Sequence, residues 1–187
     1  MKITQIKQEF VSQVKLGGIF VYPTETVYGI GCVIENKEQV AKIKQIKSRP
    51  EEQGLIILSG SWQEIEFLVK GKISQFSASI EAHANDCATF VFKASEGAPR
   101  WLVDARSSHD TVAVRITKSK LLQEILLETG PLVSTSANIS GEKSPKSFSE
   151  IAVSILEQVD FAYKKDSLLS GKESRIIDVY TNKIIRQ

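Results

Sequence analysis

Three short segments of the chain concentrate the side chains that could do chemistry: YPTETVYGIG at 22–31, KSRP at 47–50 and LVSTSANISG at 132–141. Threonine, serine and asparagine donate and accept hydrogen bonds, and lysine and arginine attract anions. Such residues directly after apolar runs are poorly suited to a core, and their small side chains let a ligand approach the backbone. The three segments together predict one binding site for a polar, anionic ligand.

The segment 132–141 begins as an apolar strand and then turns polar. In extended geometry alternate side chains share a face, so Ser134, Ser136 and Asn138 would project together toward a ligand. The alternative is a strand that leaves the sheet through turns closed by its own serine, threonine and asparagine side chains. The segment alone leaves both interpretations open.

The segment 22–31 has a similar arrangement. Thr24 and Thr26 share a face if the chain is extended there, and Pro23 fixes the angle at which the chain enters. Glu25 lies between apolar strands, where an unpaired carboxylate would be costly, so it is either exposed to solvent or holds a cation or a ligand amine. The alternative is a polar crossover between two strands that binds nothing.

The KSRP segment closes a helical pattern with two cations. Pro50 biases Arg49 toward extended geometry, so Lys47 and Arg49 could point the same way and clamp a polyphosphate. The alternative is a pair of cations that stabilises a helix C-terminus. As exposed cations, both are expected to contribute more to turnover than to folding. Arg115, inside the apolar strand VAVRI, needs an anionic partner from the protein or from a ligand.

Several common catalytic signatures are absent from the sequence. It has no Walker loop, no GxGxxG dinucleotide fingerprint and no nucleophile elbow. Cys32 and Cys87 lack metal-ligand spacing, and the isolated His83 and His109 are expected at the surface. An enzyme with this sequence would work without an obvious covalent nucleophile, and we expect no metal bound by the protein itself.

Apolar patterns along the chain predict alternating helices and strands. Helices are expected at 3–16, 36–47, from 61, at 73–85, 121–128 and 147–156; strands are expected at 19–22, 27–34, 55–58, 89–93, 111–116, 131–136 and 159–163, before a hairpin that turns at Thr181-Asn182. This interleaving favours an α/β fold, and the close spacing of several strands favours a mixed sheet covered by helices.

Length and composition indicate an ordinary globular protein. The 187 residues, 42% of them hydrophobic and 25% charged, predict a single domain over 1–187. The sequence contains no apolar run near the roughly 18–20 residues of a membrane span and no signal-peptide core, so we expect no membrane association and a cytoplasmic location. The net charge of +2 does not establish nucleic-acid binding, which depends on whether the positive residues share a face.

Taken together and in order, YPTETVYGIGC, KSRP, TFVF, VAVRI and LVSTSANISG resemble the YrdC-like family. The similarity runs from about Ile19 to Gly141 and returns at SRIIDVYTNKIIRQ. The resemblance implies a twisted open α/β sheet with a large concave, basic cavity. It also implies synthesis of threonylcarbamoyl-AMP and pyrophosphate from L-threonine, bicarbonate (or CO₂) and ATP. Partner proteins would then transfer the threonylcarbamoyl group to tRNAs that read ANN codons, so contact with tRNA would be weak or indirect.

The resemblance also implies roles for individual residues. Lys47 and Arg49 correspond to a phosphate-binding KxR and would be the catalytic pair; Thr89, Ser134, Ser136 and Asn138 would join them in binding ATP, and Thr24, Thr26 and Arg115 would bind threonine and the adenylate. Mg²⁺ would accompany the triphosphate rather than occupy a protein cage. One departure concerns a pocket wall: where the family usually carries a WPGP-like stretch, this chain reads His83-Ala84-Asn85-Asp86.

Two alternatives remain at the level of sequence. The first is a module of the same fold that binds double-stranded RNA or a tRNA stem and has no synthase activity. The second is a sibling that makes a different carbamoyl adenylate, as in hydrogenase maturation, where the domain normally sits in a much longer chain.

Overall fold

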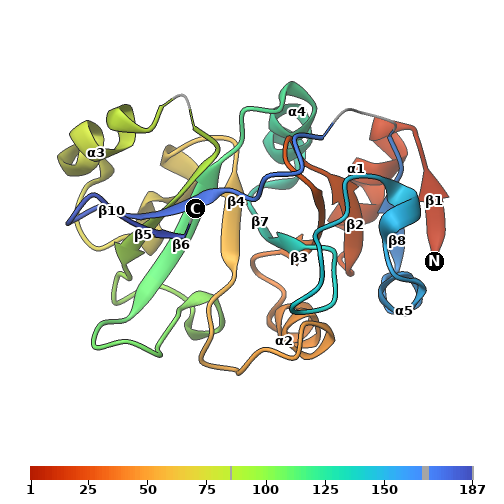
Figure 1. The fold of residues 1–187 in the computed structure, drawn as a ribbon, viewed down its shortest axis with the longest axis horizontal. Coiled ribbons are helices and arrows are strands. Elements are labelled where there is room, and N and C mark those ends of the chain that lie inside the picture. The colour runs from red at the N-terminus through yellow and green to blue at the C-terminus, as the bar shows by residue number, and fades with distance from the viewer. Residues whose placement is uncertain (85, 166–168, 187) are drawn as a thin grey trace.

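The computed structural model describes residues 1–84, 86–165 and 169–186, and Figure 1 shows how these elements are arranged. The strands are β1 (Lys2–Thr4), β2 (Phe20–Pro23), β3 (Tyr28–Val33), β4 (Ile56–Ser59), β5 (Ala88–Lys93), β6 (Thr111–Ile116), β7 (Leu132–Ser136), β8 (Phe161–Tyr163), β9 (Arg175–Asp178) and β10 (Lys183–Arg186). The α-helices are α1 (Lys7–Lys15), α2 (Lys37–Ile46), α3 (Ser77–Ala82), α4 (Lys120–Thr129) and α5 (Val153–Leu156). Short 3₁₀ helices span Gln63–Leu68, Ile73–Phe76, Arg100–Leu102 and Phe148–Glu150.

The strands form one open sheet in the order β1-β8-β2-β3-β7-β4-β6-β5-β9-β10. Four neighbouring pairs are parallel, namely β1 with β8, β8 with β2, β4 with β6 and β5 with β9. The remaining neighbours run antiparallel. The expected α/β fold with a mixed sheet is therefore confirmed, and β3, β7, β4 and β6 lie at its centre.

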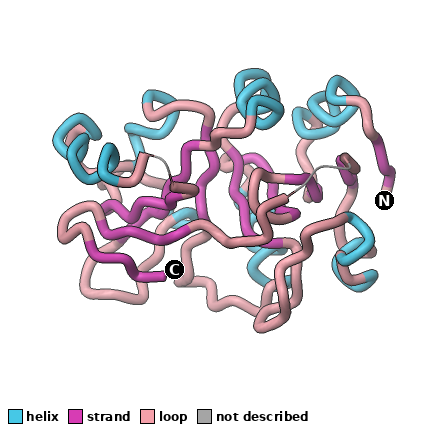
Figure 2. The backbone as a smooth tube through the Cα atoms, turned by 45° about the horizontal axis from the view of Figure 1, so that its top comes forward, coloured by secondary structure: helices cyan, strands magenta, loops and turns pink. Residues whose placement is uncertain are grey.

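Helices lie on both sides of the sheet, as Figure 2 shows. Side chains alternate along β2, so that Phe20 and Tyr22 join one apolar cluster with α1 and α4, while Val21 joins the other with α2. Phe10 of α1 is fully buried in the first cluster and meets the ring of Phe20 edge-on at 5.4 Å between centroids. No helix in the described ranges has the length and apolarity that a membrane crossing requires.

The N-terminal prediction of one helix over 3–16 is wrong. Residues Lys2–Thr4 form an edge strand that pairs with β8, and the helix begins only at Lys7. Thr4 turns the chain between them, since its hydroxyl accepts a hydrogen bond from the backbone N of Ile6 at 3.1 Å and donates one to Glu9. The three- and four-residue spacing of apolar residues that predicted one helix therefore extends over two elements, β1 and α1.

The other expected helices are kept, shortened or divided. The helix expected at 36–47 is present as α2, and Asn36 caps it by accepting a hydrogen bond from the backbone N of Gln39 at 3.2 Å. The stretch from 61 forms only a 3₁₀ helix, and the stretches 73–85 and 147–156 each divide into a 3₁₀ turn and a short α-helix. The C-terminal hairpin forms as expected, and Asn182 adopts the left-handed backbone conformation (φ 56°) in its turn.

Gly31 fixes how closely the two polar segments can approach. A Cβ atom at Gly31 would lie 2.2 Å from the backbone oxygen of Val133 on β7, whereas one at Gly29 would meet nothing nearer than 3.4 Å. We expect Gly31→Ala to lower the free energy of unfolding by about 3 kcal/mol, because β3 must move away from β7. Gly29→Ala is the matched control and should change stability little. Urea denaturation of both variants measures this, and equal stabilities would contradict it.

Candidate active site

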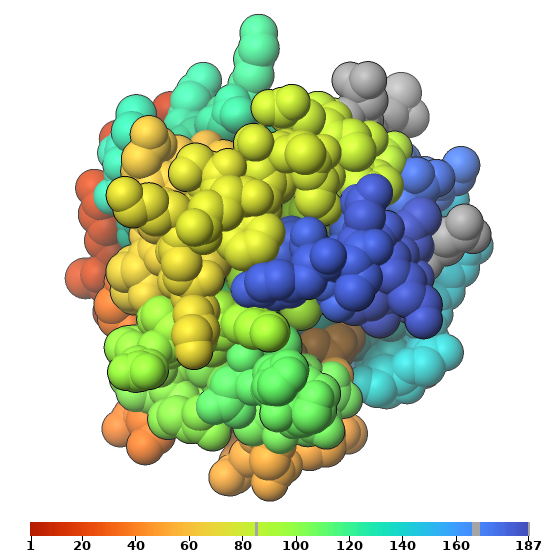
Figure 3. Space-filling view, turned by 90° about the vertical axis from the view of Figure 1, so that its left-hand side faces the viewer, coloured from red at the N-terminus to blue at the C-terminus, as the bar shows by residue number. Residues whose placement is uncertain are grey.

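The polar segments meet at a cavity of about 550 Å³ lined by the loop after β2, the turn after α2, strands β6 and β7, and the C-terminal segment. In Figure 3 a hollow opens between the C-terminal strands, in blue, and the green segment that carries Asp104–Ser107. The predicted site residues in its lining are Thr24, Thr26, Arg49, Arg115, Ser134 and Ser136. Within the described part of the chain, Lys47, Thr89 and Asn138 lie outside this lining.

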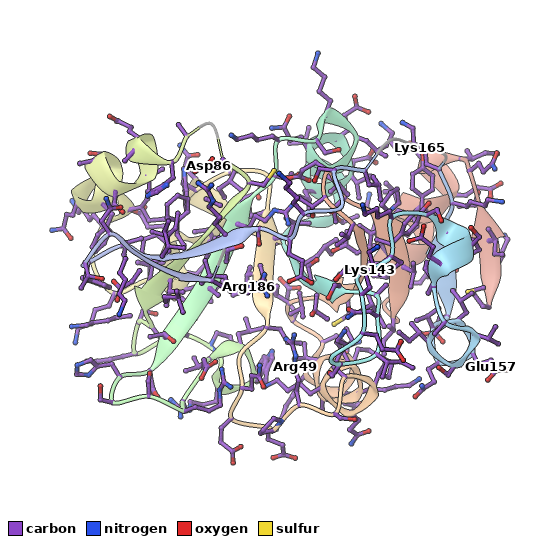
Figure 4. All side chains as sticks on the ribbon, viewed as in Figure 1. Arg49, Asp86, Lys143, Glu157, Lys165 and Arg186 are labelled. Atoms are coloured by element: carbon purple, nitrogen blue, oxygen red, sulfur yellow. The ribbon has the colours of Figure 1, made fainter. Side chains whose placement is uncertain are left out.

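Four arginines line the cavity: Arg49, Arg106, Arg115 and Arg186. Three of them are paired: Arg106 with Asp104 at 2.6 Å, Arg115 with Glu25 at 2.8 Å and Arg186 with Glu173 at 3.0 Å. The side chain of Arg49 has no hydrogen bond or ion pair among the described residues. Burial, and then the charges of Arg186 and Arg106, lower its pKa. Among the described arginines of the cavity wall, Arg49 is therefore the one whose side chain can meet an anionic ligand without leaving a protein partner. Figure 4 labels it together with Arg186.

Lys47 does not point the same way as Arg49, contrary to expectation. Ser48 between them has a left-handed backbone (φ 49°), which breaks the extended geometry. Lys47 is only 2% exposed, and its Nζ donates to the backbone oxygens of Ser136 (2.8 Å) and Asn138 and to Asn138 Oδ1 (2.9 Å). Burial and the nearby Arg49 lower the pKa of Lys47 to about 8, although three oxygen acceptors favour its charged form. A contact between Lys47 and phosphate stays a prediction.

Residues 134–138, at the end of β7 and just beyond it, place some polar groups in the cavity wall and use others to hold the fold. Ser134, Thr135 and Ser136 line the cavity, and the hydroxyl of Tyr22 donates to Ser134 Oγ at 2.7 Å, which holds that side chain in place. Asn138 faces Lys47 instead, and its Nδ2 donates to the backbone oxygen of residue 142 at 2.6 Å. The expected shared face therefore holds for the two serines and ends before Asn138, because the strand itself ends at Ser136.

Thr24 and Thr26 both reach the cavity, but through a turn rather than an extended strand. Their hydroxyls lie 2.9 Å apart. The Thr24 hydroxyl closes the turn by donating to the backbone oxygen of Val27 at 2.7 Å and accepting from the backbone N of Thr26 at 3.1 Å. This leaves the Thr26 hydroxyl next to Arg115, whose Nη1 lies 3.5 Å away.

The C-terminal segment supplies site residues that the sequence did not reveal. Glu173, Ser174 and Arg186 line the cavity, and Arg186 Nη2 donates to the backbone oxygen of Ser174 at 3.2 Å. Thr89 is fully buried, and its Oγ1 lies 2.8 Å from Oγ of Ser174. Thr89 therefore supports a residue of the cavity wall without lining the cavity itself. The only sequence signal for this contribution was the returning similarity in SRIIDVYTNKIIRQ.

The His83–Asp86 segment ties α3 to the C-terminal hairpin. Asp86 pairs with Arg175 at 2.8 Å, and His83 lies between Asp86 (3.3 Å) and Asn182 (3.2 Å). The side chain of His83 is only 13% exposed, so the expectation of an isolated surface histidine is wrong; His109 is exposed as expected. Asn85 lies outside the described residues. None of the other three residues of the segment is part of the described cavity lining.

Comparison with known proteins identifies relatives along the whole chain. The Sua5/YciO/YrdC family model, described as telomere recombination, matches residues 12–187. A threonylcarbamoyl-AMP synthase of Pseudoalteromonas translucida is 35% identical over 175 residues, 91% of each chain. A protein of the same name from Vibrio cholerae is 32% identical over 196 residues and covers both chains completely.

Solved structures share the fold. E. coli YciO superimposes with a TM-score of 0.82 at 25% identity, covering 97% of this chain and 88% of its own. P. abyssi Sua5 complexed with L-threonine superimposes with a TM-score of 0.80 at 27% identity over 95% of this chain, which spans about half of that protein (53%). The ordered motifs, the open sheet and these matches agree: the chain belongs to the Sua5/YciO/YrdC family.

Proposed function

We propose that this chain makes threonylcarbamoyl-AMP and pyrophosphate from L-threonine, bicarbonate and ATP. The observation that carries the proposal is Arg49 in the wall of the cavity, whose side chain has no partner in the part of the chain that the structure describes. It lies in the same cavity as the hydroxyls of Ser134 and Ser136 and the guanidinium of Arg115. The guanidinium of Arg49 suits a polyphosphate, the serine hydroxyls can exchange hydrogen bonds with a nucleotide, and the guanidinium of Arg115 suits the carboxylate of an amino acid. Relatives that span the whole chain carry the name of this activity.

The proposed chemistry needs no covalent enzyme intermediate. The threonine amine attacks the carbon of bicarbonate or CO₂ to form a carbamate, with loss of water in the bicarbonate case. A carbamate oxygen then attacks the α-phosphorus of ATP, and pyrophosphate leaves. Positioning and stabilisation of charge can drive both steps. This fits a cavity lined by arginines and hydroxyls.

Arg49 would hold the phosphates, beside the guanidinium groups of Arg106 and Arg186, each of which is paired with a carboxylate. Ser134 and Ser136 would contact the nucleotide, and Arg115 would receive the threonine carboxylate beside Thr24 and Thr26.

We also propose that Mg²⁺ arrives with the triphosphate. Of the carboxylates in the cavity wall that the structure describes, Asp104 and Glu173 are paired with arginines, and Asp178 accepts hydrogen bonds from the backbone N atoms of Tyr180 and Thr181. This leaves phosphate oxygens and water as the better ligands. The product would pass to transfer proteins that modify tRNA, in the cytoplasm.

A pyrophosphate-release assay with single amino acids tests the proposal. With ATP, Mg²⁺ and bicarbonate, we expect release that depends on L-threonine and is much slower with alanine or valine, which lack its hydroxyl group. Release at the same rate without an amino acid would contradict the synthase. Salt-sensitive binding of double-stranded RNA with no ATP turnover would instead favour the RNA-binding module.

A further inference from the structure

Glu25 is held inside the protein, next to the cavity but outside its described lining. Its side chain is 17% exposed and lies 2.8 Å from Arg115 Nη2. It also accepts hydrogen bonds from Thr117 Oγ1 at 3.1 Å and from the backbone N of Lys118 at 3.4 Å. Burial raises the pKa of Glu25, but the charge of Arg115 and, to a smaller extent, the hydroxyl of Thr117 act against burial, and the pKa lies below its usual value. Glu25 is therefore a fixed carboxylate.

The Glu25 carboxylate forms its ion pair with Arg115. Its side chain is 9% exposed and lines the cavity. Nη2 lies at ion-pair distance from Glu25 without the alignment of a hydrogen bond, and Nη1 reaches Thr26 Oγ1 at 3.5 Å. Nε has no hydrogen-bond partner in the described ranges. A buried donor without an acceptor is costly, so the incomplete hydrogen bonding of this cavity-lining guanidinium indicates that a ligand oxygen completes it.

The loop that carries Glu25 is held by backbone hydrogen bonds from residues 170–171. The backbone N atoms of Ser170 and Gly171 donate to the backbone oxygens of Glu25 (3.3 Å) and Thr26 (2.8 Å). The carboxylate and the Thr26 hydroxyl therefore approach Arg115 from one rigid turn. Glu25 and Thr26 thus fix the positions of Nη2 and Nη1. Because the guanidinium group is planar, these two positions also fix the direction in which its Nε–H points.

We propose that Glu25 is the positioning residue of the Arg115 subsite: by orienting the guanidinium, it sets the affinity for the carboxylate of the amino-acid substrate. The ligand in this statement rests on the proposed function. A carboxylate that acted only as a counter-charge would do the opposite, because removing it would leave Arg115 more positive and tighten binding of an anion. The two roles therefore predict changes of opposite sign.

Glu25→Gln tests this, with Glu157→Gln, at an exposed position after α5 (Figure 4), as the matched control. By calorimetry we expect Glu25→Gln to weaken L-threonine binding about ten-fold or more and to change ATP binding by less than about two-fold. In the pyrophosphate assay the KM for threonine should rise while the KM for ATP stays unchanged. Glu25→Asp, which keeps the charge, should recover part of the affinity. Unchanged or tighter threonine binding would overturn the proposal.

A second readout does not depend on the reaction. The Nε–H resonance of Arg115, assigned by its loss in Arg115→Lys, should shift and exchange faster with water in Glu25→Gln but not in Glu157→Gln. An unchanged resonance would overturn the positioning role. If the wild-type protein released no threonine-dependent pyrophosphate while the resonance responded to Glu25→Gln, the proposed function would fail and the orientation of Arg115 by Glu25 would stand. Should Glu25→Gln not fold, Glu25→Asp carries both comparisons.

Discussion

Arg49→Ala is expected to lower kcat/KM for ATP in threonine-dependent pyrophosphate release by about 100-fold or more. The guanidinium has no protein partner among the described residues, so its removal costs the ligand its contact and leaves no protein group unsatisfied. The free energy of unfolding should therefore change by less than about 0.5 kcal/mol. Steady-state kinetics and urea denaturation of the same preparation measure the two quantities.

Arg100→Ala is the matched control for this experiment. Arg100 pairs with Asp110, its side chain is 70% exposed, and it lies outside the cavity lining. It should leave turnover unchanged. Equal loss of activity in both variants would indicate a general effect of the lost positive charge. Full activity of Arg49→Ala would contradict a role of Arg49 in binding the phosphates.

Lys47→Met is expected to damage both folding and turnover. The change leaves the backbone oxygens of Ser136 and Asn138 and the side-chain oxygen of Asn138 without their buried donor. We expect the free energy of unfolding to fall by about 3 kcal/mol. Turnover should fall as well, because the segment that carries Ser136 into the cavity loses its attachment to the turn after α2.

Lys42→Met, on the exposed face of the helix α2 that precedes Lys47, is the control and should match the wild type in both measurements. A ligand-free Lys47→Met variant as stable as the wild type, but inactive, would contradict the structural role. That result would favour direct contact between Lys47 and phosphate.

The sequence predicted the site best where side-chain alternation followed real strands. Ser134 and Ser136 lie on β7 and both reach the cavity. Asn138 and Lys47 were also expected at the cavity, but they hydrogen-bond to each other outside its lining. The reason is that the strand ends at Ser136 and that Ser48 turns the chain with a positive φ. Backbone conformation at single residues decides such directions, and residue types alone do not reveal it.

Residues contributed by distant segments could not be predicted in this way. Arg106 comes from a loop and Arg186 from an edge strand whose residues are all in the exposed class, and neither segment has a periodic pattern that points inward. Arg186 reaches the cavity because β9 pairs with β5 and β10 follows it in a hairpin. The loop of Arg106 is held instead by the backbone pairing of Asp104 with Thr111. At the other end, Ile3 and Ile6 have helical spacing but are exposed, and the edge strand that contains Ile3 owes its place to pairing with β8.

The most direct test of the synthase is detection of its product from labelled bicarbonate. Wild-type protein incubated with ATP, Mg²⁺, L-threonine and ¹³C-bicarbonate should form a nucleotide with the mass of threonylcarbamoyl-AMP carrying one ¹³C, together with one pyrophosphate per molecule formed. Arg49→Ala should form almost none, and Arg100→Ala should form as much as the wild type. Pyrophosphate release without ¹³C in any nucleotide product, or no release with threonine present, would contradict the proposed reaction.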